Sequence, residues 1–244
     1  EDVINYCHNE DPSLRNRVMV MNGFRDSSEY GDFADIILHK NDRDAYTSAA
    51  KKVNMDDEIG VVSVQHEFGI FGDPKGREFT GEFLFDFLDA LKKPVITTCH
   101  TVPSKTSKDP KSQRRREALA GILTRSDKIL AISETAKNLL IEEYGVDPEK
   151  VRRIYHGVHT FNETPNHSKQ VLGLEDRFVL STVGLVRKKR GIEDVIRALP
   201  DVVERHPEIL YVVAGKAHPK EIESNGREPY RELLVSETRR LDLE

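Results

Sequence analysis

The chain has 244 residues, a length that suits one or two domains with a sizeable hydrophobic core. Charged residues make up 32% of the composition and the formal net charge is -5, so no overall positive field favours nucleic acid or an anionic membrane. No apolar run reaches about 18 residues, which argues against a membrane-spanning helix, and the polar N-terminus is unlike a signal peptide. The cysteines, Cys7 and Cys99, are too few for a disulfide framework, so we expect a cytoplasmic protein with Cys99 as a buried thiol.

Short β-branched runs alternate along the chain with stretches of helical length. In chain order the runs are 18–20, 36–38, 61–64, 94–98, 129–132, 151–155, 178–183 and 209–213. Near-continuous apolar strands that alternate with helices are typical of a parallel sheet covered on both faces. The sequence therefore predicts an α/β fold of the doubly wound kind.

Three helix signals stand out. Apolar residues recur at i, i+3 and i+4 over 192–203, and Pro200 inside this stretch predicts a kinked or split helix. Another helix is expected from a Ser133 cap to a stop near Gly145. The triplet that starts at Asp42 imitates a metal-binding DxD motif, but Asp is a good helix cap, so we interpret it as the start of a helix.

The segment 160–169, TFNETPNHSK, is polar and lacks periodicity, so we predict that it is a linker. It divides an N-terminal domain, 1–165, from a second α/β domain, 170–244. Only two predicted strands precede Glu244 in the second domain, so we expect this domain to be truncated. The first strand of the N-terminal domain is also expected to be missing.

Polar or ionisable residues follow most of the predicted strands. They are Gln65-His66-Glu67, His100-Thr101, Ser133, His156-Gly157, Gly184 to Gly191 and Lys216-Ala217-His218. Ligands of open α/β sheets bind beyond the carboxyl ends of the strands, so these groups are expected to converge on one edge and form a binding cleft. The alternative is that they are ordinary polar turn residues, and the agreement among several strand ends favours function.

The strongest local chemistry is a basic loop between a predicted strand and a predicted helix. It starts at Gly184, ends at Gly191 and contains the consecutive cations Arg187, Lys188, Lys189 and Arg190. A helix N-terminus favours phosphate, and cationic side chains add charge-assisted hydrogen bonds. A solvated basic loop is the alternative; nucleic-acid binding is disfavoured because no aromatic residues are interleaved.

Several catalytic motifs are absent. The chain has no GxxxxGK[ST] loop, no GxGxxG after a strand and no GxSxG elbow. His66-Glu67 imitates the start of a zinc-protease HExxH motif, but Ile70 stands where the second His is needed. His100, directly after an apolar run, is either a proton shuttle or partner of a sugar hydroxyl, or a structural histidine.

Together, five ordered stretches resemble the family-4 retaining glycosyltransferases, especially a bacterial subgroup with QHEFGIFGG, TxHTV, IPHGV and GKGIE motifs. The stretches are VQHEFGIFGD (64–73), TTCHTV (97–102), IYHGV (154–158), GLVRKKRGIE (184–193) and AGKAHP (214–219), the last followed by EPYRELL (228–234). The resemblance covers residues 60–244, and residues 1–60 match only in a general way.

The resemblance implies a GT-B fold, with two Rossmann-like domains and an active site in the cleft between them. It implies sugar transfer, with retention, from a nucleoside-diphosphate sugar of the GDP-mannose or UDP-glucose type to a hydroxyl of a carbohydrate or glycolipid acceptor. Neither a catalytic metal nor a cofactor is expected. No nucleic acid partner is expected either, and peripheral membrane contact is compatible with the family.

Site residues carry over by position. His100 and Glu67 are the expected catalytic residues; Gly184, Arg187, Lys188 and Arg190 are expected at the donor phosphates; and His66, Thr101, His156 and His218 are expected to line the acceptor and sugar cleft. Leu185 stands where the wider family has Arg, and Arg190 replaces the family's phosphate-binding Lys. The chain ends before the family's E-x7-E segment, so we expect the fragment to be inactive.

Two other functions fit the same features. A GT-B nucleotide-sugar epimerase or sugar phosphorylase shares the fold and the cleft without transferring a sugar to such an acceptor. A non-catalytic module that binds a nucleotide or a sugar is the alternative from another functional class.

Overall fold

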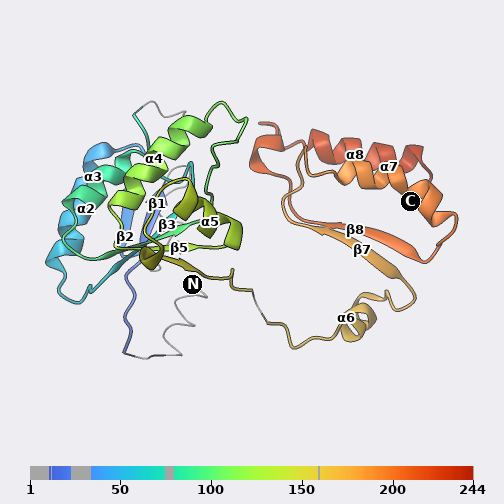
Figure 1. The fold of residues 1–244 in the computed structure, drawn as a ribbon. Coiled ribbons are helices and arrows are strands. Elements are labelled where there is room, and N and C mark those ends of the chain that lie inside the picture. The colour runs from blue at the N-terminus through green and yellow to red at the C-terminus, as the bar shows by residue number, and fades with distance from the viewer. Residues whose placement is uncertain (1–10, 12, 23–33, 75–79, 159, 244) are drawn as a thin grey trace. The chain divides into compact units, whose positions relative to one another are not determined.

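The computed structural model describes residues 11, 13–22, 34–74, 80–158 and 160–243, and the chain divides into two compact units, Glu1–Val158 and His159–Glu244. Cys7 lies outside the described residues. In the first unit the elements are β1 (Met19–Asn22), β2 (Ile36–His39), α2 (Arg43–Met55), β3 (Val62–His66), α3 (Phe83–Ala90), β4 (Val95–Cys99), α4 (Ser112–Thr124), β5 (Lys128–Ala131), α5 (Glu134–Glu142), a 3-10 turn (Pro148–Lys150) and β6 (Val151–Arg153) (Figure 1).

The second unit continues the alternation of strands and helices. Its elements are α6 (Pro165–Leu172), β7 (Phe178–Val183), α7 (Ile192–Val203), β8 (Ile209–Ala214), a 3-10 turn (Pro219–Glu221) and α8 (Pro229–Arg240). All eight predicted strands are present, and every pair of them that is hydrogen-bonded is parallel. The prediction of a parallel α/β fold is confirmed.

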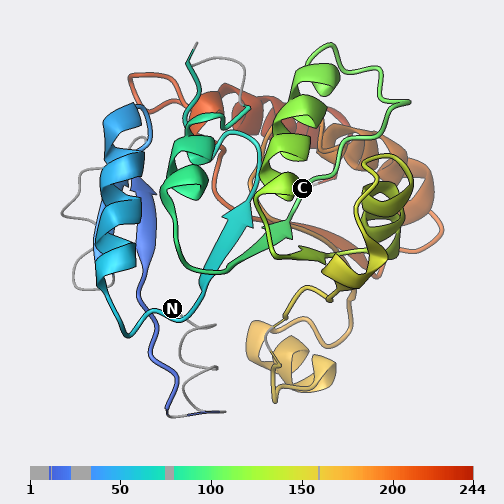
Figure 2. The same ribbon diagram turned by 60° about the vertical axis from the view of Figure 1, so that its left-hand side comes forward.

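The first unit holds two parallel sheets, one of β1 and β2 and one in the order β3-β4-β5-β6. Helices α2, α3 and α4 lie side by side over the strands (Figures 1 and 2). The apolar side chains of α3 explain its place in the middle of this layer. Phe83, Leu84, Phe87 and Leu88 are all buried, as expected for a helix that turns one apolar stripe toward the core.

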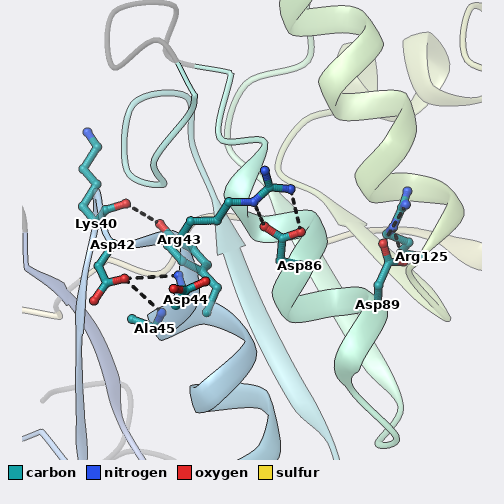
Figure 3. Close-up of polar contacts among 9 residues, drawn as sticks. Lys40, Asp42, Arg43, Asp44, Ala45, Asp86, Asp89 and Arg125 are labelled. Atoms are coloured by element: carbon teal, nitrogen blue, oxygen red, sulfur yellow. Dashed lines mark hydrogen bonds and ion pairs between the residues drawn. The ribbon is translucent and has the colours of Figure 1, made fainter.

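The opposite side of α3 carries carboxylates that bind arginines of both neighbouring helices (Figure 3). Arg43 of α2 donates to Asp86 with an Nε–Oδ2 distance of 2.6 Å, and its guanidinium lies over the Phe83 ring. Arg125, at the end of α4, donates to Asp89 over the same distance, 2.6 Å between Nε and Oδ1. Each pair is bidentate, the geometry that makes an Arg–carboxylate contact directional. The two pairs fix α3 between α2 and α4.

In the second unit, α7 and α8 cover one face of the two-stranded sheet of β7 and β8 (Figure 1). Ile192 and Ile196 of α7 pack with Tyr230 and Leu234 of α8 in a small core, against which Tyr211 and Val213 of β8 pack. The i, i+4 spacing of the α7 pair is the period that puts both side chains on one face.

The helix starts are partly as predicted. Asp42 caps α2 by accepting from the backbone N–H groups of Asp44 and Ala45, and Ser133 caps α5 by accepting from the N–H of Ala136. Both caps satisfy amide groups that the first turn of a helix leaves unpaired.

Two segments of the second unit differ in part from what the sequence predicts. The segment predicted as a linker contains α6 from Pro165 onward, because Thr164 caps the N–H of His167 and proline fits the first helical position. Helix α7 is not split at Pro200. Only three residues follow Pro200 in this helix, which ends at Val203, so the backbone hydrogen bond that the proline cannot donate, to the carbonyl of Ile196, lies near the helix end.

The segment after β3 approaches β2 so closely that one position admits only glycine. A Cβ atom at Gly72 would overlap the backbone carbonyl of Lys40 and come within 2.7 Å of Cδ2 of Phe83. Neither neighbour can move away easily, because the Lys40 carbonyl belongs to the backbone and the Phe83 ring is buried in the core.

We therefore expect Gly72→Ala to lower the free energy of unfolding by about 1–3 kcal/mol, the range for overpacking a core. Urea unfolding measures the change. Gly60→Ala is the matched control, since no atom lies within 4 Å of its added Cβ. Equal stability of the two variants would contradict the close approach.

Candidate functional site

The ends of β3 and β4 bring four polar side chains together. The two strands pair in register, with Gln65 opposite Thr98 and His66 opposite Cys99. The Thr101 hydroxyl donates to Glu67 Oε2 at 2.6 Å, and His100 Nε2 lies 2.9 Å from Gln65 Oε1. The expected catalytic pair, His100 and Glu67, therefore lies on two linked hydrogen-bonded exits of one sheet.

A fifth polar group comes from the end of β6. The His156 ring is exposed, and its centroid lies 5.6 Å from that of His100. His100 follows β4 and His156 follows β6, and β5 lies between these two strands in the sheet. The chain after β6 therefore turns back across the sheet edge to bring the two rings together. The structure thus places His100, Glu67, Thr101 and His156 in one cluster.

A shallow cavity of about 340 Å³ adjoins this cluster. Its lining combines imidazole and hydroxyl groups with apolar side chains: His100, Thr101, Val102, Ile132, Ser133, Thr135, Ala136 and Leu139. The volume falls within the range of small-molecule sites, and the mixed lining suits a ligand with hydroxyl groups and an apolar face. Thr135 and Leu139 had no signal in the sequence, because both lie on the regular helix α5.

His66, predicted to line the acceptor cleft, does not reach the surface. Its side chain is fully buried, with an exposed fraction of 0%, and its ring packs edge-on against Phe68 and parallel to Phe71. Neither ring nitrogen has a hydrogen-bond partner among the described residues. His66 directly follows the exposed Gln65 in β3, and neighbouring residues of a strand point to opposite faces, so the His66 side chain points inward. His66 supports the site from below.

Burial also lowers the pKa of His66 to about 4, and nearby Glu67 opposes the effect only in part. The unfolded chain, with an ordinary histidine pKa near 6.5, therefore takes up a proton first as the pH falls. The stability contributed by the neutral buried ring is present above pH 6.5 and is lost as the pH falls toward 4.

We expect the free energy of unfolding to fall by about 2 kcal/mol between pH 7 and pH 5 because of His66. Urea titrations of the wild-type chain and of His66→Leu at both pH values isolate this share, since leucine cannot be protonated. The exposed His167 provides the control variant, His167→Leu. An unchanged pH dependence in His66→Leu would show that the buried imidazole is not its source.

The loop after β3 is held from the side of β2 and α2 by residues that sequence reasoning missed. The Lys40 ammonium donates to the carbonyl of Gly69, and Tyr46 donates its hydroxyl proton to the carbonyl of Lys40 at 2.9 Å. The same tyrosine oxygen accepts from the N–H of Gly72 at 2.9 Å. Burial raises the pKa of Tyr46 to about 12, so the hydroxyl keeps its proton and its donor role. A lone tyrosine on a helix gives no sequence signal for such a role.

In the second unit, the basic loop is fixed at one point and open elsewhere. Val186 is 1% exposed and forms a parallel bridge with Ala217. Its N–H donates to the carbonyl of Lys216 at 2.8 Å, and its carbonyl accepts from the N–H of His218 at 2.9 Å. The loops after β7 and β8 therefore run side by side, and His218 lies next to the basic loop as a consequence.

The four cations of the basic loop are exposed: Arg187, Lys188, Lys189 and Arg190. In the part of the chain that the structure describes, none of their side chains forms a hydrogen bond or an ion pair. Helix α7 follows directly, and its cap, Gly191, provides no side chain to satisfy the first N–H groups. Cationic side chains and a helix N-terminus are thus available to an anion at one place.

Two glycines shape the start of this loop. Gly184 has a φ of 130°, a positive value that glycine adopts readily and that residues with a Cβ atom disfavour. A Cβ atom at Gly215 would overlap the carbonyl of Gly184, so the exits of β7 and β8 touch backbone to backbone. Gly184, predicted at the donor phosphates, lies at this junction.

The acidic residues of the first turn of α7 are engaged elsewhere. The Tyr230 hydroxyl donates to Glu193, and this hydrogen bond is the main cause that lowers the pKa of the carboxyl. Asp194 forms an ion pair with Arg197, with 3.7 Å between Oδ1 of Asp194 and Nη1 of Arg197.

The described residues contain neither a candidate metal site nor a candidate membrane-spanning helix. Within them no three His, Cys, Asp or Glu side chains gather as candidate metal ligands. Cys99 is buried and unpaired, as predicted, and burial raises its pKa to about 12. Over the same ranges, no helix has both the length and the apolar character needed to cross a bilayer.

Residues 79–160 match the Glycosyltransferase Family 4 domain. The match covers about a third of the chain and includes His100, Thr101 and His156. A D-inositol 3-phosphate glycosyltransferase of Corynebacterium kroppenstedtii is 24% identical over 161 residues, which cover 57% of the chain and 36% of the relative. The enzyme of the same name from Acidothermus cellulolyticus is 25% identical, over 53% of the chain and 32% of the relative. The alignment thus spans about a third of these relatives' length.

Solved structures share the fold over nearly the whole chain. A glycosyltransferase of Rickettsia africae superposes with a TM-score of 0.58 at 16% identity, covering 99% of the chain and 60% of the solved chain. A putative UDP-N-acetylglucosamine 2-epimerase of Listeria monocytogenes gives 0.58 at 13% identity, covering 98% and 61%. These likenesses identify the architecture as Rossmann-like and of the GT-B kind.

Proposed function

We propose that the chain is part of a retaining glycosyltransferase that moves a sugar from a nucleoside-diphosphate sugar to an acceptor hydroxyl. The observation that carries the proposal is the cluster of His100, Glu67, Thr101 and His156 at the carboxyl edge of a parallel sheet. The family-4 match runs through three of these residues. The names of the relatives support glycosyl transfer as the reaction class.

The basic loop provides the proposed site for the donor diphosphate. Arg190 and Arg187 present planar guanidinium groups that can bind phosphate in a bidentate way, Lys188 adds a point charge, and Gly184 lets the backbone turn into the loop. The N-terminus of α7 adds oriented N–H groups. These groups would stabilise the departing diphosphate, so the proposed mechanism uses protein cations and neither a metal ion nor a cofactor.

Retention is proposed to follow from attack on the face of the sugar that the leaving group occupies. The bond from the acceptor oxygen to the anomeric carbon forms while the bond from that carbon to phosphate breaks. The acceptor proton passes to the departing phosphate oxygen. In this scheme His100 contacts the transferred sugar, Glu67 orients the acceptor together with Thr101, and His156 and His218 line the places where sugar hydroxyls bind.

The acceptor is proposed to be a carbohydrate, a glycolipid or a related polyol. The mixed lining of the cavity next to His100 suits a ring with hydroxyl groups on its edge and C–H groups on its face. D-inositol, the acceptor that the names of the relatives indicate in phosphorylated form, is a ring of this kind.

Removing Arg190 tests the donor assignment. In the enzyme that contains this chain, we expect Arg190→Ala to lower turnover roughly a hundredfold or more, since one such charge contact stabilises the transition state by about 2.7–4 kcal/mol. Steady-state release of nucleoside diphosphate measures the loss. Arg205→Ala is the matched control, because Arg205 lies beyond the opposite end of α7. A loss below about threefold, the size of an exposed ion pair, would contradict the assignment.

Product analysis separates the transferase from the related activities. The transferase releases nucleoside diphosphate only when an acceptor is present and forms a new glycoside. An epimerase converts the donor without an acceptor, and a phosphorylase needs inorganic phosphate. Calorimetric binding of UDP or GDP with no turnover under any of these conditions would indicate a non-catalytic binding module.

A further inference from the structure

Gln65, the fourth residue of β3, lies beside His100 without having an assigned role. Its side chain is exposed, and the strand register sets it opposite Thr98 of β4. The amide therefore lies at the edge of the sheet with one end toward the strands and the other toward His100.

The two ends of the amide have different partners. Gln65 Nε2 lies 3.3 Å from Thr98 Oγ1 and 3.4 Å from Ser63 Oγ, and both hydroxyl oxygens can accept from the amide N–H groups. Thr98 is 3% exposed, so this end of the amide is held by a fixed group. The amide carbonyl oxygen, Oε1, faces His100.

A carbonyl oxygen accepts hydrogen bonds and cannot donate them. The contact of 2.9 Å between Gln65 Oε1 and His100 Nε2 therefore requires a proton on Nε2. In the neutral ring, Nδ1 then has no proton and becomes the acceptor. It has no hydrogen-bond partner among the described residues, and His100 itself lines the cavity of about 340 Å³.

Three ionisable groups lie near the His100 ring. His66, from β3, is buried with its pKa lowered to about 4 by burial, so it stays uncharged at neutral pH. The Glu67 carboxylate, from the end of β3, already accepts from the N–H of Phe68 and the hydroxyl of Thr101. His156, from the end of β6, faces the ring at a centroid distance of 5.6 Å.

We propose that Gln65 is a positioning residue that holds His100 as the Nε2–H tautomer, so that Nδ1 accepts a hydrogen bond from a hydroxyl of the bound sugar or acceptor. The identity of this hydroxyl rests on the proposed glycosyl transfer. The tautomer itself does not, because it follows from the contacts of the free chain.

Imidazole NMR of the 15N-labelled chain tests the tautomer without substrate. In the wild type we expect a His100 Nε2–H signal that is protected from exchange with water. At a pH where the ring is neutral, we expect no proton on Nδ1. Gln65→Met, which keeps the length of the side chain and loses the carbonyl, should abolish the protection. Gln65→Glu should retain it, since a carboxylate oxygen also accepts.

Gln113→Met is the matched control, because Gln113 lies exposed on α4 and bonds to Glu117 instead of a histidine. Its His100 signal should equal that of the wild type. A proton on Nδ1 in the wild type overturns the proposal, and so does an unchanged Nε2–H signal in Gln65→Met. The wild-type measurement stands even if Gln65→Met does not fold.

Kinetics of the whole enzyme then show what the tautomer does. Gln65→Met should lower kcat/KM roughly three- to tenfold, the worth of one ordinary hydrogen bond, and Gln65→Glu should restore part of it. If the tautomer is found but the whole enzyme transfers no sugar, the assignment of the reaction fails while the role of Gln65 in orienting the ring holds. If the enzyme transfers sugar and Gln65→Met leaves kcat/KM unchanged, the proposed hydrogen bond from the substrate to His100 Nδ1 is wrong.

Discussion

The parallel pairing of β3 with β4 is the constraint on which the first unit depends. Because His66 lies opposite Cys99, both strands end at the same level and the residues after them share one edge of the sheet. Two hydrogen bonds then join the exits, one between Gln65 and His100 and one between Thr101 and Glu67. A slip of one residue would turn Gln65 inward and His66 outward, so the register decides which side chains a ligand can meet.

The support of this edge comes from groups that no ligand touches. Tyr46 bonds both the end of β2 and the loop after β3, so a single buried hydroxyl ties together segments that are far apart in the sequence. Gly72 allows that loop to lie against the backbone of Lys40. The polar residues at the surface keep their places because this layer beneath them is closely packed.

The sequence predicts the strands well because each is a short apolar run with β-branched residues, and it predicts the caps at Asp42 and Ser133 because capping is local chemistry. It misleads where tertiary structure decides. His66 follows Gln65 directly in a polar triplet, but only the register shows that the two side chains point to opposite faces. The helix at Pro165 was hidden by polar residues that suit both a linker and a helix start. The roles of Tyr46 and Lys40 depend on distant backbone and leave no local pattern.

The basic loop is a local concentration of charge in a chain whose net charge is -5. Among the described residues, none of its four exposed cationic side chains pairs with a carboxylate. The nearby carboxylates of Glu193 and Asp194 on α7 contact Tyr230 and Arg197 instead. At physiological ionic strength the Debye length is about 8 Å, so the rest of the acidic surface is largely screened from this loop. The attraction for an anionic ligand is therefore short in range, and added salt should weaken its binding by slowing association more than by hastening release.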